Sequence, residues 1–178
     1  MKLRSNAQQV QMPEDAGVFI KPGLFLILLI GVMFQLILLT GCEKSDSFIE
    51  NEVNPQINVF EIKLNMPESK LHELITPKPE KVQCINGYEF EYTDKKINIG
   101  INSQTAEVRR VTTKNPQTSI YGITPGVALE KAYKAISTSG FVEDNDSKYK
   151  FRKENVILSV ISMKGTHADG IEIEIKPD

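Results

Sequence analysis

Sixteen uncharged residues, Leu24–Leu39, form the longest apolar run of the chain, and the sequence becomes polar soon after it. Lys21 precedes the run, and Lys2 and Arg4 lie further upstream. A basic flank, an apolar core and then small residues are typical of a secretory signal peptide. A helix that crosses a hydrocarbon core of about 30 Å takes roughly 20 residues, so this run is short for a membrane span. A retained single-pass helix is the alternative.

Two segments of the remaining chain repeat one order of patterns, a short amphipathic helix and then three strands with alternating apolar and polar residues. The first helix opens at Met66–Lys70. The second is expected to be capped by Thr124, with Pro125 at its first position. The strands are expected at 88–92, 97–101 and 107–112 in the first segment, and at 148–152, 156–160 and 171–175 in the second.

The spacing of these elements predicts an internal duplication with a period of about 60 residues. Pro67 of the first segment recurs as Pro125 in the second, and Tyr88 recurs as Tyr149. The expected fold class is α+β, a tandem duplication of a helix followed by a three-stranded antiparallel meander, with the helices packed on the sheet. The alternative is a chance recurrence of ordinary α+β patterns.

The predicted units follow from the same patterns. They are a cleaved signal peptide at 1–41, a flexible polar tether at 42–57 and a duplicated domain at 58–178, with repeats at about 58–115 and 116–178.

Composition narrows the function classes. The formal net charge is −2, which gives no concentrated basic surface of the kind that nucleic acid requires. The chain has no Trp and two His, so a metal or catalytic centre has few residues to draw on. The two cysteines are Cys42 and Cys84.

The stretch Leu39-Thr40-Gly41-Cys42 resembles the lipobox of bacterial lipoprotein precursors, with an aliphatic residue, two small residues and then cysteine. The resemblance implies cleavage before Cys42 and a diacylglyceryl thioether on its sulfur. Two acyl chains anchor a protein stably, whereas one binds only marginally. The expected location is therefore a cell membrane, with the domain lipid-anchored and facing outside the cytoplasm. Lipidation of Cys42 leaves Cys84 without a disulfide partner in the chain.

The stretch Ile123–Gly126, which leads into the second helix, is followed by Gly140-Phe141 and three strands. This arrangement is similar to the two-repeat α+β fold of the β-lactamase-inhibitor-protein type and of small envelope lipoproteins. In the first segment Pro67 stands near the place of Gly126. The resemblance implies a sheet that binds a partner or supports the envelope. It transfers no inhibitory contact residue, so β-lactamase inhibition is not predicted.

Catalytic motifs are missing from the sequence. It contains no Gly-x-Ser-x-Gly elbow, no phosphate-binding glycine loop and no His-Glu-x-x-His. Cys84 with His72 or His167 is a conceivable nucleophile–base combination. We favour Cys84 as a small buried residue, His72 as a surface or boundary residue and His167 as part of a hairpin tip. No catalytic residue, metal site or cofactor is predicted.

A basic strip is expected on one strand, formed by Lys148, Lys150 and Arg152. It is a candidate contact for an acidic partner or for lipid head groups, and the alternative is a solvated strand face. The first segment has Glu89 and Glu91 at the matching positions, so opposite charges would pair if the two sheets met.

The expected function is that of a non-enzymatic, membrane-anchored envelope lipoprotein that binds an envelope protein or cell-wall component, or supports the envelope. The alternatives are an envelope enzyme with an unrecognised site near Cys84 and an uncleaved single-pass membrane protein. No nucleic-acid partner is expected.

Overall fold

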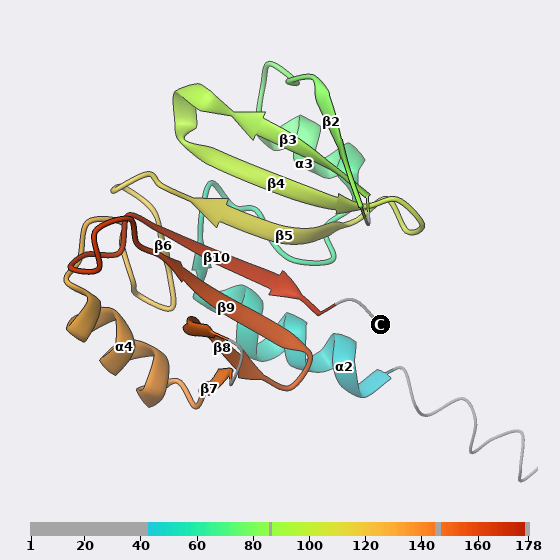
Figure 1. Ribbon diagram of the computed structural model, residues 1–178. Coiled ribbons are helices and arrows are strands. Elements are labelled where there is room, and N and C mark those ends of the chain that lie inside the picture. The colour runs from blue at the N-terminus through green and yellow to red at the C-terminus, as the bar shows by residue number, and fades with distance from the viewer. Residues whose placement is uncertain (1–42, 86, 145–146, 177–178) are drawn as a thin grey trace, which may run out of the picture. The chain divides into compact units, whose positions relative to one another are not determined.

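An eight-stranded antiparallel sheet dominates the computed structural model, which describes residues 43–85, 87–144 and 147–176 (Figure 1). Mixed helices and antiparallel strands confirm the predicted α+β class. The chain divides between Gly41 and Cys42 into two units, and the described residues all belong to the second. The predicted signal peptide and Cys42 lie outside the described residues.

The sheet has the strand order β2-β3-β4-β5-β10-β9-β8-β7, with every neighbouring pair antiparallel. The first run of four strands joins the second where β5 pairs with β10, and there Val111 lies opposite Ile173. The strands are β2 (Lys81–Cys84), β3 (Gly87–Tyr92), β4 (Ile97–Asn102), β5 (Val108–Thr113), β7 (Val142–Asp144), β8 (Ser147–Lys153), β9 (Val156–Ile161) and β10 (Gly170–Ile175).

Each run has four strands rather than the predicted three. The extra strands, β2 and β7, form the two edges of the sheet and contain four and three residues. Neither strand has a fully buried residue, so neither carries the alternation of buried and exposed positions that reveals a strand in a sequence.

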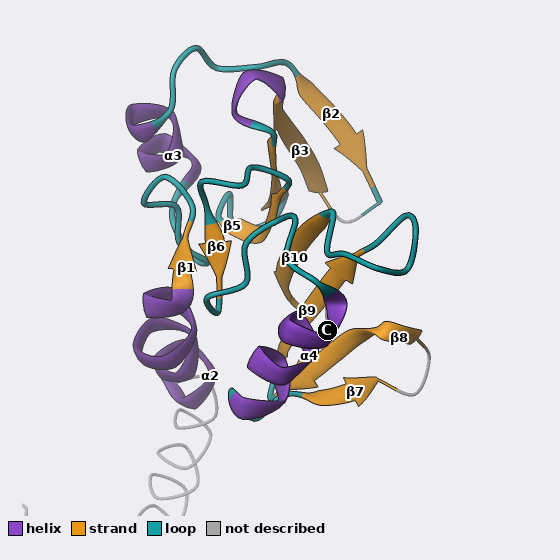
Figure 2. Cartoon of the chain, turned by 90° about the vertical axis from the view of Figure 1, so that its left-hand side faces the viewer, coloured by secondary structure: helices purple, strands orange, loops and turns teal. Residues whose placement is uncertain are grey.

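The helices cover one face of the sheet. They are α2 (Glu43–Phe48), α3 (Glu68–Leu74) and α4 (Leu129–Thr138), with a π-helical turn η1 (Ile49–Val53) and 3₁₀ turns η2 (Asn54–Gln56) and η3 (Thr93–Lys95). Figure 2 shows α2, α3, α4 and the small ribbon of β1 (Ile57–Asn58) with β6 (Ser119–Ile120) on the same side of the sheet. The core lies between these elements and the sheet, and Phe90, Ile99 and Leu158 point into it with no exposed surface. In both views the opposite face has no α-helix of the described chain over it.

The prediction of a flexible tether at 42–57 is wrong for most of its length. The chain is helical from Glu43 to Gln56, and Ile49, Val53 and Ile57 are 2%, 0% and 2% exposed. These three apolar residues recur every fourth position, so a helical chain brings them to one face, which packs into the core. The polar composition of the segment predicts a tether. Composition ignores the order of the residues, so it misses the four-residue spacing of these apolar side chains.

The predicted helix cap at Thr124 is also wrong. Helix α4 begins at Leu129, directly after Ala128, whose ψ of 140° is extended. The N–H of Ala168 donates to the carbonyl of Val127 at 2.8 Å. The segment before α4 is therefore used for pairing with the loop ahead of β10 instead of for a first helical turn.

Equivalent backbone contacts recur in the two runs. The N–H of Asn65 donates to the carbonyl of Val108 at 2.8 Å, and the N–H of Gly126 donates to the carbonyl of Ala168 at 2.7 Å. Asn65 and Gly126 both adopt positive φ, at 61° and 100°. Asn65 and Gly126 thus make matching contacts, and the predicted match of Pro67 with Pro125 is three residues out of register with them.

Candidate functional site: the polar cluster around Glu68

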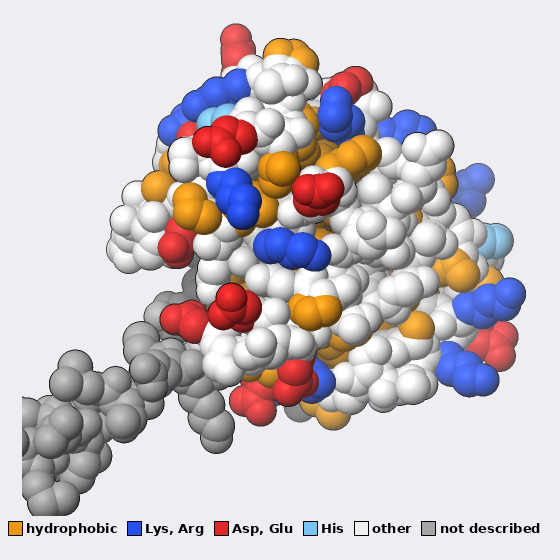
Figure 3. Space-filling model, turned by 180° about the vertical axis from the view of Figure 1, so that it is seen from behind, with side chains coloured by type: hydrophobic (Ala, Val, Ile, Leu, Met, Phe, Trp, Pro, Cys, Tyr) orange, Lys and Arg blue, Asp and Glu red, His pale blue; other side chains and the backbone are white. Residues whose placement is uncertain are grey.

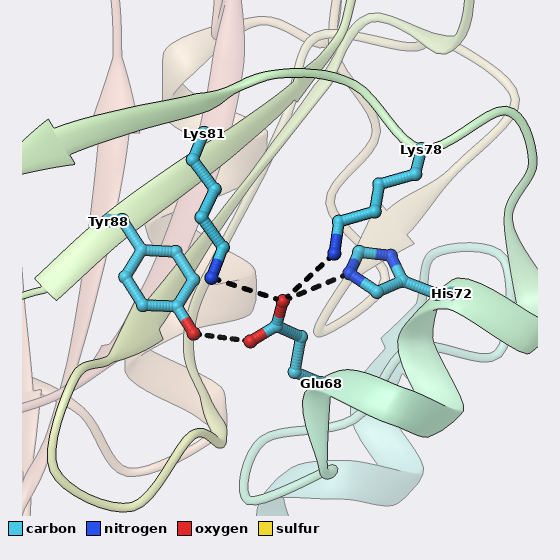
Figure 4. Close-up of polar contacts among 5 residues, drawn as sticks. All are labelled: Glu68, His72, Lys78, Lys81 and Tyr88. Atoms are coloured by element: carbon cyan, nitrogen blue, oxygen red, sulfur yellow. Dashed lines mark hydrogen bonds and ion pairs between the residues drawn. The ribbon is translucent and has the colours of Figure 1, made fainter.

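Four side chains of the first run converge on the carboxylate of Glu68, and we call the five residues the Glu68 cluster (Figure 4). Glu68 and His72 lie one turn apart on α3, so their side chains share a face of the helix. Lys78 comes from the loop after α3, Lys81 from β2 and Tyr88 from β3.

The contacts of the Glu68 cluster divide between the two carboxylate oxygens. Glu68 Oε1 lies 3.2 Å from His72 Nε2, 3.4 Å from Lys78 Nζ and 3.5 Å from Lys81 Nζ. The Tyr88 hydroxyl donates to Oε2. Both oxygens of the carboxylate are therefore occupied by partners from this chain.

The electrostatics of the cluster keep Glu68 ionised and Tyr88 neutral near pH 7. Burial by itself raises the pKa of Glu68, but hydrogen bonds from Tyr88, His72 and Lys78, with the nearby charge of Lys81, lower that pKa to about 2. Burial and the Glu68 carboxylate raise the pKa of Tyr88 to about 12. A general acid or base works best with a pKa near the working pH. Near pH 7 the Glu68–Tyr88 pair is therefore suited to holding structure and charge rather than to proton transfer.

The side chains of the cluster also pack against aromatic rings. The His72 ring meets the Phe90 ring edge-on, with centroids 4.8 Å apart. Lys81 Nζ lies 3.9 Å from the Tyr88 ring centroid, and Lys78 Nζ lies 5.4 Å from that of Phe90, which is the geometry of cation–π contacts. The cluster thus fastens the loop after α3 and the edge strand β2 onto the helix.

The second run keeps the ring contact of this cluster and not its charges. Each helix begins directly after an extended residue, and Leu129 there stands in the place of Glu68. Tyr133 stands in the place of His72 and contacts Phe151, with ring centroids 5.5 Å apart. The cluster is therefore a property of the first run, and the second run holds its helix without these charges.

The strand register shows the same loss of charge complementarity. Lys81 of β2 pairs with Phe90, whereas Glu143 of β7 pairs with Phe151. An acidic residue thus lies where the first run has the lysine that faces Glu68.

Sequence reasoning identified one member of this cluster and missed its chemistry. The sequence suggests His72 as a base for Cys84, but His72 Nε2 contacts Glu68 instead. The spacing of four residues between Glu68 and His72 is the one available signal, because Lys78, Lys81 and Tyr88 reach the site from separate elements.

Cys84 and His72 lie on opposite faces of the sheet. Cys84 pairs with Gly87, which shares the face of Glu89, whereas His72 packs against Phe90 on the helix-covered face. Cys84 is half-buried on an edge strand rather than buried as expected. The structure therefore does not assemble this nucleophile–base pair.

His167, the alternative base, is an exposed residue of the loop between β9 and β10. Its Nδ1 lies 3.0 Å from Thr166 Oγ1. Within the described parts of the chain, no three His, Cys, Asp or Glu side chains are grouped so as to hold a metal ion.

The predicted basic strip lies on the uncovered face of the sheet, which we call the open face. Lys148, Lys150 and Arg152 are exposed on β8, whereas Phe151 points into the core. Glu89 and Glu91 lie on β3, and four strands separate β3 from β8. At about 4.8 Å per strand spacing the two groups are far out of contact, so they do not pair.

Arg110 occupies the middle of the open face between two carboxylates. It forms an ion pair with Glu89, and its Nε lies 3.8 Å from Glu172 Oε2. Asn98 donates to Glu89 at 2.8 Å, and Thr112 donates to Glu172 at 2.9 Å. These five residues line a groove of about 430 Å³ on this face. Because the charge of Arg110 is compensated by these two carboxylates, Arg110 does not add to the positive charge of the basic strip.

The helix-covered side also carries charges of both signs. Figure 3 shows acidic and basic side chains interspersed there with apolar ones. On the open face the basic strip occupies β8, Glu172 and Glu174 lie on β10 beside Arg110 of β5, and Glu89 and Glu91 lie on β3.

Comparisons with protein-family models, with curated proteins and with solved structures found no match for this chain. In the part of the chain that the structure describes, no helix has the length and apolar character needed to cross a membrane.

Proposed function

We propose that this chain is a bacterial envelope lipoprotein, anchored through Cys42 outside the cytoplasm, and that it binds an acidic partner without catalysing a reaction. The observation that carries the binding role is the basic strip of the open face, three exposed basic side chains at alternating positions of β8. An antiparallel sheet can leave one face to water, so the gathering of three basic side chains on one strand, more than the exposure itself, supports an acidic partner.

The anchor rests on the order of the N-terminal features. The apolar run Leu24–Leu39 is followed directly by the lipobox-like stretch that ends at Cys42. Cleavage before Cys42 would leave the second unit of the chain, Cys42–Asp178, as the mature protein. Two acyl chains on that residue would hold it on the membrane surface.

Mass spectrometry of the protein from membranes tests the anchor. The wild type should lack residues 1–41 and carry acyl groups on its N-terminal cysteine. Cys42→Ser should keep residues 1–41 and carry no lipid, and the control Cys84→Ser should be processed like the wild type. An unmodified Cys42 in a full-length wild-type chain would contradict the proposal and favour the single-pass alternative.

We also infer that the domain arose by tandem duplication, in which Asn65 is the counterpart of Gly126 and Pro67 is that of Ala128 rather than of Pro125. The hydrogen bonds of Asn65 and Gly126 support this alignment, and β4 and β9 have the same order of buried and half-buried positions. The short strands β1 and β6, which precede the two helices at equivalent places, pair with each other through Asn58 and Ser119. Pairing between equivalent segments is expected at the axis of a pseudo-two-fold arrangement.

Charge reversal tests the role of the open face. Lys150→Glu with Arg152→Glu should abolish recovery of an acidic partner from envelope extract by the immobilised protein. The control reverses Lys131 and Lys134, which are exposed on α4 on the helix-covered side. Equal recovery of the same partner by both double variants would exclude the basic strip as the contact.

A further inference from the structure

The segment between the proposed anchor and the sheet is packed onto the domain. We call this segment, α2 with η1 and η2, the strut. Its residues Ile49 and Val53 are buried in the common core. Lys153 of β8 lies with its Nζ 3.1 Å from Glu52 Oε2 and 5.5 Å from the Phe48 ring centroid, so the strut is also tied to the sheet from outside the core.

The end of the strut is locked by side-chain contacts with the backbone. The Asn54 amide accepts from the Leu64 N–H at 2.8 Å and donates to the Leu64 carbonyl at 3.1 Å, as a neighbouring strand would. Lys63 Nζ donates to the carbonyls of Asn54 and Ile57 at 2.5 and 2.8 Å. A cation at the C-terminal carbonyls of a helical segment is favoured by the helix dipole.

Because the strut is short, its packing also limits how far the domain can lie from Cys42. Cys42 is joined by one peptide bond to Glu43, the first residue of α2. At about 1.5 Å per helical residue, Glu43 lies roughly 9 Å from the buried Ile49 along the strut. A flexible tether of some fifteen residues would instead span on the order of 20 Å and allow the domain to turn freely.

We infer that the strut holds the sheet against the bilayer surface in one orientation, so that the partner of the open face is a protein embedded in the same membrane. This inference rests on the proposed lipidation of Cys42. A partner in a cell-wall layer far from the bilayer would lie beyond the reach of a domain mounted in this way.

Charge favours a membrane protein over the lipids themselves. The exposed side chains near the start of the strut include the carboxylates of Asp46 and Glu50. Anionic head groups repel carboxylates, so this end of the domain has no electrostatic reason to bind an anionic bilayer. The basic strip, which is the proposed contact of the acidic partner, lies on the open face of the sheet instead.

Energy transfer to a labelled bilayer tests the orientation. The lipidated mature chain, Cys42–Asp178, in the Cys84→Ser background is placed in phosphatidylcholine vesicles that carry a head-group acceptor dye. A donor dye is attached at Glu80→Cys or at Lys164→Cys, two exposed positions in different runs. We expect the two positions to give different transfer efficiencies. A twelve-residue Gly-Ser insertion between Cys42 and Glu43 should lower both and bring them closer together.

The strut itself supplies matched variants. Ile49→Ser with Val53→Ser should release it and reproduce the effect of the insertion, whereas Glu50→Ser, at an exposed position, should behave like the wild type. Efficiencies that the insertion leaves unchanged would overturn the fixed orientation. If Cys42 is lipidated in that sample, the proposed anchor still stands. An unmodified Cys42 would instead contradict the proposed anchor, and with it the inference that depends on it.

Photo-crosslinking from position 150 in intact cells tests the partner class. The adduct should remain with the membranes after an alkaline carbonate wash, and it should disappear in the chain with the Gly-Ser insertion. An adduct found in the cell-wall fraction, or one that the insertion leaves unchanged, would overturn the assignment to a membrane protein.

Discussion

At the scale of single residues, Glu68 has the densest set of charged contacts in the described chain. Replacing it by Gln removes the negative charge that Lys78, Lys81 and His72 surround. We expect Glu68→Gln to lower the free energy of unfolding by about 2 kcal/mol at pH 7, the range for hydrogen bonds to charged groups. Urea denaturation measures it. Glu73→Gln, at an exposed position of the same helix, should change little.

The pKa of Glu68 also predicts a pH dependence. The pKa is about 2 in the folded protein, against an ordinary value of 4.5. A lowered folded-state pKa stabilises the protein above the unfolded value, and this stabilisation is lost as the pH falls from about 4.5 toward 2. The stability difference between the wild type and Glu68→Gln should therefore shrink over that interval. A difference that stays constant from pH 7 to pH 2.5 would contradict the network.

Asn65 and Gly126 occupy equivalent left-handed positions, which substitutions can compare. A Cβ at Gly126 would meet no atom within 4 Å, so the cost of Gly126→Ala is that of its backbone conformation alone. We expect Gly126→Ala to lower the free energy of unfolding by about 1 kcal/mol, and Gly126→Asn to cost less because Asn tolerates this region. Thermal unfolding of the two variants measures the difference. A larger loss of unfolding free energy for Gly126→Asn than for Gly126→Ala would show that the φ of 100° is not the reason for glycine at this position.

At the scale of elements, substitutions in the strut test whether this segment is folded onto the domain or is a flexible tether. Ile49→Ala and Val53→Ala should each lower the free energy of unfolding by about 2 to 4 kcal/mol, because each leaves a cavity in the core. Glu50→Ala, exposed between them, should stay within about 0.5 kcal/mol of the wild type. Denaturant titration of the mature chain gives all three values. Small effects for all three would mean that the segment does not pack on the domain in solution.

Central and edge strands differ in how far the sequence predicts them. The expected strands at 97–101 and 171–175 correspond to β4 (Ile97–Asn102) and β10 (Gly170–Ile175). Their inward positions are isoleucines, whose alternation is a local signal. The edge strands β2 and β7 exist because a neighbouring strand offers backbone partners, and those partners are not visible in the edge segment itself.

At the scale of the whole domain, the two runs share one sheet and one core. Val111 of β5 lies opposite Ile173 of β10, and both are fully buried. We expect the amides of β4, β5, β9 and β10 to exchange hydrogen with the same opening free energy, because those strands open only in global unfolding. Amides of the edge strands β2 and β7 should exchange faster. Native-state hydrogen exchange measures both, and separate opening energies for the two runs would contradict a shared core.

Local signals in the sequence were enough to predict several features of this domain. They include the α+β class, the inward faces of the central strands and the exposure of Lys148, Lys150 and Arg152, since period-two alternation determines which side chains share a face. The N-terminal cleavage and lipidation also rest on a linear stretch, and they stay predictions.

Contacts between distant segments became visible only in three dimensions. The fold joined the two runs into one sheet, placed Cys84 and His72 on opposite faces and packed the supposed tether as a strut. It also assembled the Glu68 cluster, whose members come from a helix, a loop and two strands. The cause is the same in each case. Burial and charge pairing depend on neighbours in space, and a residue's neighbours in sequence do not specify them.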